Sequence, residues 1–221
     1  MNREFDLIIY GATGFTGKLA VEYIDNNYRD LKWAIAGRSP EKLSQISNST
    51  KSKPPIFIAM SDDSNILSEV VKKTKVIASL AGPFSKYSNE LVNQCYENNT
   101  NYVDITGENI WVRDLIDRYH KGCEDKGIFI IPSCGYDSIP SDIGSFYCHL
   151  MLNENIDHID GYHTGKGGVS GGTIESVFNM KNYKSSYKIG HPFLLNSKEF
   201  TKNNYNSKSK DKFSIKYIKD I

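Results

Sequence analysis

Three glycines near the N-terminus stand at a spacing that can hold a phosphate group. In the stretch LIIYGATGFTGKLAVEYI, Gly11, Gly14 and Gly17 follow a short apolar run and precede a pattern of helical period. Such glycines allow a tight turn, a close approach of phosphate to the backbone, and close packing of helix on strand. Free N–H groups at the helix start would then bind the negative charge. The alternative is a tight turn with a structural purpose only.

The next apolar run indicates which nucleotide would bind. It ends in WAIAGRS, about 20 residues after the glycines, where a site for NAD carries an acidic residue that binds the ribose 2′-hydroxyl. Arg38 and Ser39 instead suit a 2′-phosphate, because a guanidinium group binds phosphate oxygens in pairs. The sequence therefore favours NADP over NAD, although Arg38 stacked on adenine would leave NAD open.

A third segment, SLAGPFSKY, ends another apolar run with the bend Gly82-Pro83. In this type of fold that strand end faces the pyrophosphate and the nicotinamide ribose. We expect the three segments together to bind the cofactor through Gly11, Thr13, Gly14, Phe15, Thr16, Gly17, Arg38, Ser39, Gly82 and Pro83.

Hydride transfer usually needs a proton donor near the cofactor ring, and the candidates are few. Tyr87 follows the bend, and Asp137 follows the last apolar run, where it could instead cap the next helix. Asp104 and Glu108 in YVDITGE could form a carboxylate pair for acid–base work, or simply end a strand and start a helix. The histidines lack partners at metal-ligand spacing, so we expect no metal site.

Six short apolar runs alternate with segments of helical periodicity. Runs that are apolar almost throughout are typical of parallel strands buried on both faces. We therefore predict an α/β fold, a doubly wound parallel sheet of the dinucleotide-binding Rossmann type, with the first strand central. The predicted strands are Phe5–Tyr10, Trp33–Ala36, Ile56–Ala59, Val76–Leu80, Tyr102–Ile105 and Ile128–Ile131.

The alternation of apolar runs and helical segments ends after the sixth run, and we predict that the chain divides into three parts. Residues 1–152 form the dinucleotide-binding domain, which ends in a helix containing Ile139 and Leu150 that packs on the sheet and leads out of it. Residues 153–190 begin a second α/β domain, with a helix over Thr173–Lys184, and do not complete it. Residues 191–221 form a tail rich in Lys, Asn and Ser, either solvated or settled on an anionic membrane.

The composition excludes several classes of protein. The net charge of +1 gives no excess of basic residues for binding nucleic acid. The longest apolar runs are far shorter than the roughly 20 residues that a membrane helix needs. The four cysteines form no C-x-x-C pair, which favours reduced thiols. We expect a cytoplasmic protein or one that is peripheral to a membrane.

Five motifs, in order, resemble the saccharopine dehydrogenase-like oxidoreductases, which include saccharopine reductase and the trans-acting enoyl reductases of lipid biosynthesis. They are YGATGFTG, AIAGRSPEKL, AGPF, YVDITGE and GYDSIPSDIG. The resemblance implies a Rossmann domain, a nicotinamide cofactor, a second domain that closes over the substrate, and an association with lipid metabolism or lipid droplets. Departures also occur: Ala59 is followed by Met60 where relatives carry Asp, so Asp62 or Asp63 would have to replace an adenine contact.

Three functions follow as hypotheses. The first is an NADP-dependent oxidoreductase acting on a small, lipid-like substrate, and the second is a nucleotide-binding protein that lacks catalysis because its second domain is incomplete. The third, a saccharopine-type reductase, would need arginines to bind the substrate carboxylates, and few are present. An incomplete second domain would leave Phe146, Tyr147 and Val177 exposed and favour self-association through that open face.

Overall fold

The structure is a computed structural model of the 221-residue chain. It describes residues 3–152, 159–163, 168, 171–185, 187 and 193–197. Most of the predicted tail over residues 191–221 lies outside the described residues, so that prediction stays a prediction.

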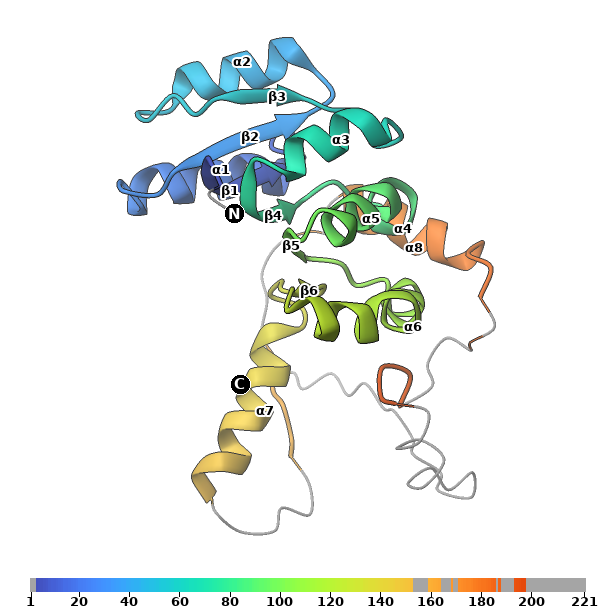
Figure 1. Ribbon diagram of the computed structural model, residues 1–221. Helices are drawn as coiled ribbons and strands as arrows, with labels where there is room; N and C mark the ends of the chain where they lie inside the picture. Colours follow the sequence, from blue (N-terminus) through green and yellow to red (C-terminus); the bar gives the residue numbers. More distant parts are fainter. Residues whose placement is uncertain are drawn as a thin grey trace.

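Six parallel strands form one sheet in the order β3-β2-β1-β4-β5-β6, as Figure 1 shows. This confirms the predicted doubly wound parallel sheet with its first strand central. Boundaries differ from the predicted ones by one or two residues, as is usual at strand ends. The strands are β1 (Phe5–Tyr10), β2 (Trp33–Gly37), β3 (Ile56–Ile58), β4 (Thr74–Ser79), β5 (Asn101–Asp104) and β6 (Ile130–Ile131).

Helices cover the sheet on both faces and build two separate cores. On one face, α1 (Phe15–Asn27) and α2 (Pro40–Ser49) pack around buried Ile9 and Ile35. On the other face, three helices pack around Ile8 and Ile77; they are α3 (Ser64–Val71), α5 (Asn89–Glu97) and α6 (Asn109–Lys126). Adjacent residues of a strand point to opposite faces, so Ile8 and Ile9 serve different cores.

The strand order reverses between β1 and β4, which lie side by side at the centre. From β1 the chain continues through α1 to β2 on one side, and it later returns to β4 on the other. In open parallel sheets, ligands bind in the crevice outside the carboxyl ends of the strands at such a reversal. The fold thus directs attention to the end of β1, where the three glycines lie.

The sheet is less well covered at its β6 side. Along β4 and β5, Ile77 and Tyr102 are buried, whereas Val76, Ala78 and Val103 on the other face are only partly buried. Ile131 in β6 is 47% exposed. One face of this half of the sheet therefore remains partly open to solvent among the described residues.

The prediction that the helix after the sixth strand packs on the sheet is wrong for α7 (Ile139–Leu152). Its apolar residues were expected to pack on the sheet, but none of its residues is buried, and the helix projects away from the sheet in Figure 1. The spacing of apolar residues in the sequence shows which face of α7 could pack, but it does not show which part of the protein covers that face. Phe146 and Tyr147 are 59% and 61% exposed, and Val177, in the next helix, is 67% exposed.

That next helix, α8 (Gly171–Lys181), begins and ends slightly before the predicted range. It lies beside the short helix α4 (Phe84–Tyr87) and near α5 in Figure 1. Tyr183, just after α8, donates a hydrogen bond to Asp114 of α6 at 2.8 Å. No helix among the described residues is long and apolar enough to cross a membrane.

Candidate functional site

Two of the three glycines are required by close backbone contacts. Gly11 has a φ of +82°, and a Cβ there would lie 2.8 Å from the amide nitrogen of Ala81. A Cβ on Gly17 would lie 2.3 Å from the carbonyl oxygen of Gly11, far inside contact distance. The chain can therefore turn from β1 into α1 this tightly only when both side chains are absent.

Gly14 differs because the space beside it is open. It is the exposed N-cap residue of α1, and a Cβ there would meet only the Gly11 carbonyl oxygen, at 3.4 Å. Phe15 and Thr16 follow with exposed side chains, and their backbone N–H groups donate to no acceptor among the described residues. No acidic residue occurs in the first turn of this fully described helix. A helix start with free donors and no negative charge can bind a phosphate.

Arg38 and Ser39 directly follow β2, at the carboxyl edge of the sheet. Arg38 is exposed. Burial and the charge of Asp62 raise the pKa of Tyr10 to about 12, and the positive charge of Arg38 acts in the opposite direction. The Ser39 hydroxyl donates to a Glu41 carboxylate oxygen at 3.3 Å. Ser39 thus occupies the N-cap position of α2, but its side chain accepts no hydrogen bond from the helix backbone. Of the two acids that could replace the adenine contact, Asp63 caps α3 by accepting from Ile66 N–H at 3.0 Å.

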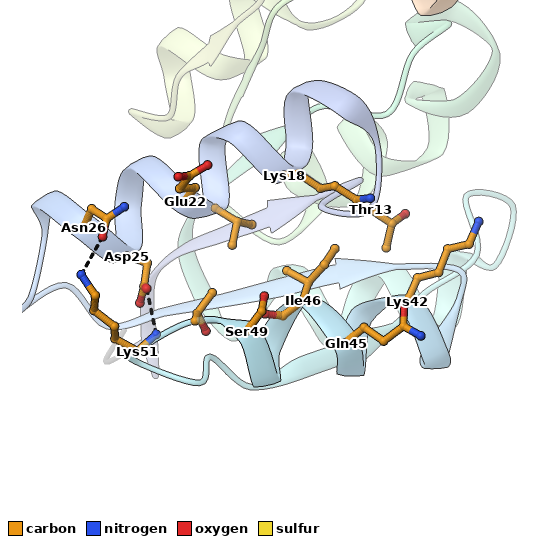
Figure 2. A pocket seen from close by; sticks show the side chains of 12 residues that line it. Thr13, Lys18, Glu22, Asp25, Asn26, Lys42, Gln45, Ile46, Ser49 and Lys51 are labelled. Carbon is orange, nitrogen blue, oxygen red and sulfur yellow. Dashed lines mark hydrogen bonds between the residues drawn. The ribbon is translucent and has the colours of Figure 1, made fainter.

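A cleft of about 610 Å³ between α1 and α2 was not predicted. Figure 2 shows Thr13, Lys18 and Lys42 toward one end, and Asp25, Asn26 and Lys51 joined by hydrogen bonds at the other. Thr13 belongs to the glycine loop, so this end adjoins the proposed phosphate site and brings Lys42 to it. Lys42 lies four residues after Arg38 and in the first turn of α2. This nearness in sequence to Arg38 could have indicated Lys42 as a second basic residue for the cofactor.

The bend after β4 lies at the same edge of the sheet. Gly82 and Pro83 are joined by a cis peptide bond and lead into α4, which ends at Tyr87. Tyr87 is half-buried, and the Lys86 ammonium lies 4.8 Å from the centroid of its ring. The interaction with Tyr87 raises the pKa of Lys86, so this ammonium keeps its charge beside the tyrosine.

The Glu108 carboxylate accepts four hydrogen bonds from described residues, which favours a structural role. It is 1% exposed and accepts from the N–H groups of Phe84 and Ser85 at 2.8 and 3.0 Å. The hydroxyls of Ser85 and Ser176 also donate to it. The side chain thus binds the start of α4, just after the Gly82-Pro83 bend, from a position 24 residues further along the chain.

Asp104, the other acid of this motif, ends β5 and is also buried. It accepts from Tyr102 Oη at 2.9 Å, Thr106 N–H at 2.9 Å and Ser133 N–H at 3.0 Å. Burial raises the pKa of Asp104 to about 6, although all three hydrogen bonds lower it. Both carboxylates therefore hold the ends of strands and turns together, which favours the structural alternative for each.

Asp137, the second candidate proton donor, lies in the turn that follows β6. Its carboxylate is exposed and forms no hydrogen bond with a described residue, so it does not cap α7 through a described contact. Tyr87 and Asp137 thus both follow strands at the carboxyl edge of the sheet, after β4 and β6, with β5 between those strands. No described group of three or more His, Cys, Asp or Glu side chains could hold a metal ion.

Comparison with known families identifies this arrangement. Residues 7–131 match the family described as the saccharopine dehydrogenase NADP binding domain. The chain belongs to this family. The predicted family resemblance and the predicted cofactor, NADP, are confirmed, and the open glycine loop with its free N–H groups fits that cofactor.

Relatives and solved structures extend the comparison. A Mycobacterium tuberculosis protein provisionally named trans-acting enoyl reductase is 33% identical over 87% of this chain and 49% of its own length. A Caenorhabditis elegans protein named lipid droplet localized protein is 30% identical over 85% and 47%. The chain thus spans about half the length of the curated relatives it matches.

A solved structure of Saccharomyces cerevisiae saccharopine dehydrogenase (L-Glu forming) superposes with a TM-score of 0.57. It is 16% identical, and the match covers 67% of this chain and 31% of the yeast chain. This likeness concerns the fold alone.

The glycine loop of this NADP-binding domain gives a matched pair of tests. Gly17→Ala should destabilise the fold by about 1–3 kcal/mol, because its Cβ would overlap the Gly11 carbonyl. Gly14→Ala should leave stability nearly unchanged and weaken NADPH binding, since its Cβ would occupy the open side of the loop. Urea unfolding and fluorescence titration with NADPH measure the two effects. Equal stability of both variants would contradict this account of the loop.

Asp104 predicts a pH dependence of stability. Because its folded pKa of about 6 exceeds the ordinary value of 3.8, the folded state binds a proton more tightly than the unfolded state. Its stabilising contribution is full below pH 4 and is lost as pH rises toward 6, by about 3 kcal/mol. Asp104→Asn lacks this titration. The free energy of unfolding of the variant should therefore rise relative to that of the wild type as the pH increases from 4 to 6. A constant difference in urea unfolding across these pH values would contradict the burial effect.

Proposed function

We propose that this chain is the cofactor-binding part of an NADPH-dependent oxidoreductase that reduces a lipid-like enoyl or keto substrate. The observation that carries the proposal is the open glycine loop at the end of β1. Its free N–H groups lie where the strand order reverses. The names of the mycobacterial and nematode relatives support the reaction and the lipid-like substrate.

The bound NADPH would supply a hydride to an electron-poor substrate carbon. In our proposal the N–H groups of Phe15 and Thr16 bind the pyrophosphate, while Arg38 and Lys42 bind the 2′-phosphate. Tyr87 is the proposed proton donor, because its phenol follows the Gly82-Pro83 bend at the cofactor edge of the sheet, with the Lys86 ammonium 4.8 Å from its ring centroid. Asp137 is the second candidate, since it follows β6 at the same edge.

A saccharopine-type reductase is disfavoured because two of the five arginines already bind other groups. Arg113 is buried, pairs with Asp117 at 2.6 Å and donates to the carbonyl of Asn196. Arg3 donates to the carbonyl oxygens of Lys72 and Asn98. Neither guanidinium is free to bind a substrate carboxylate.

The exposed apolar surface supports a proposal about partners and location. Val177 and Phe178 are also exposed, but they belong to α8, which lies beside α4 and away from α7 in Figure 1; the apolar side chains of α7 form this surface. We propose that it pairs with a second copy of the chain or rests on a lipid surface, such as a lipid droplet, from the cytoplasmic side. An apolar helix without charged residues in its second half fits either contact; the final turn of α7 reads CHLML.

Arg38→Ala should weaken NADPH binding far more than NADH binding. One charge-assisted contact to the 2′-phosphate accounts for about 1.5–3 kcal/mol, and NADH lacks that phosphate. Calorimetric titration with both cofactors measures the difference, and Arg29→Ala is the matched control because Arg29 follows the far end of α1. Equal losses for NADPH and NADH would remove Arg38 from this role.

The activity itself is tested by following NADPH absorbance with a panel of enoyl and keto lipid thioesters. We expect slow turnover, Tyr87→Phe to lower it by at least tenfold, and light scattering to show self-association through the exposed helices. NADPH binding without oxidation of any substrate would favour the alternative of a nucleotide-binding protein without catalysis. A monomer with rapid turnover would show that the apolar face needs no partner for activity.

A further inference from the structure

One buried carboxylate joins the cofactor edge of the sheet to the segment that follows the NADP-binding domain. Glu108 accepts two backbone N–H groups from the start of α4, directly after Gly82-Pro83. It also accepts from the hydroxyl of Ser176 in α8 at 3.0 Å. The side chain of Asn179, one helical turn further, donates to Ser85, which in turn donates to Glu108.

The helix α8 is turned so that its polar side faces the domain. Ser176, Asn179 and Tyr183 recur at spacings of three and four and bond to Glu108, Ser85 and Asp114. Ile174, Val177 and Phe178 on the other side are exposed. Specific hydrogen bonds, rather than burial of apolar side chains, therefore define how α8 meets the cofactor edge.

We propose that Glu108 is a positioning residue that couples α8 to the cofactor-binding bend. The contact of α8 with Glu108 fixes the start of α4, and with it Gly82, Pro83 and Tyr87. Movement of α8 therefore changes the affinity for NADPH although α8 itself need not touch the cofactor. The inference rests on the proposed role of this bend in cofactor binding.

The physical reason is the cost of an unsatisfied buried charge. A carboxylate that is 1% exposed must receive its hydrogen bonds from protein groups, because little water reaches it. When Ser176 withdraws, the charge loses a donor and water enters beside α4. The backbone N–H groups of Phe84 and Ser85 then open more often, and the bend is less well ordered for the cofactor.

The test compares two hydrogen bonds of the same segment. Ser176→Ala removes one of the four donors to Glu108, while Tyr183→Phe removes one of the two donors to Asp114 and leaves the hydrogen bonds of Glu108 in place. We expect Ser176→Ala to speed hydrogen exchange of the α4 amides in the cofactor-free protein, and to weaken NADPH binding, each by roughly threefold to tenfold. Tyr183→Phe should change neither quantity, and Ser176→Thr, which keeps a hydroxyl, should restore both.

Glu108→Gln is the stronger perturbation, because its amide N–H group would face the donors from α4; we expect at least tenfold weaker NADPH binding. Equal effects of Ser176→Ala and Tyr183→Phe, or no effect of either on α4 exchange, would overturn the coupling. Wild-type protein that failed to bind NADPH would instead refute the cofactor assignment. The exchange measurement decides the coupling in either case, since it needs no cofactor.

Discussion

The contact between Gly17 and the Gly11 carbonyl is the constraint on which the cofactor site depends. A Cβ at position 17 would lie 2.3 Å from that oxygen, so α1 can start this close to β1 only with glycine there. The close start directs the N–H groups of Phe15 and Thr16 toward the carboxyl edge of the sheet. Because β1 is the strand at which the order reverses, the same contact places the proposed phosphate site at the centre of the fold.

The other half of this edge depends on buried charge instead of close backbone packing. Asp104 joins the end of β5 to the segment after β6, and Glu108 joins the start of α6 to the start of α4. Each carboxylate receives at least three donors, which compensates for its removal from water. Glycine contacts thus shape the side of the proposed site that would bind phosphate, and carboxylates hold the side that would meet the nicotinamide.

The sequence predicted the strands well because a strand buried on both faces is apolar almost throughout, as in Phe5–Tyr10 and Trp33–Gly37. The glycine loop was equally predictable, since the positive φ of Gly11 and the contact of Gly17 with the Gly11 carbonyl are local, although Gly11 also approaches the distant Ala81. Glu108 was ambiguous because its partners lie 24 and 68 residues away, and no local pattern encodes them. The packing of α7 was wrong for a related reason: apolar spacing shows that a helix has a packing face and does not identify what covers it.

The two amphipathic helices at the end of the described domain differ in a way that bears on function. α8 meets the domain through polar side chains and exposes its apolar side, while α7 has no buried residue and exposes most of its apolar side chains. Hydrogen bonds such as those to Glu108 are directional and break over small displacements, whereas apolar contact tolerates sliding. A partner that covered the apolar side of α8 could therefore shift this helix slightly and be sensed at the cofactor bend. The apolar side of α8 and the buried carboxylate would then act as two ends of one connection, with α8 as the element that transmits the contact.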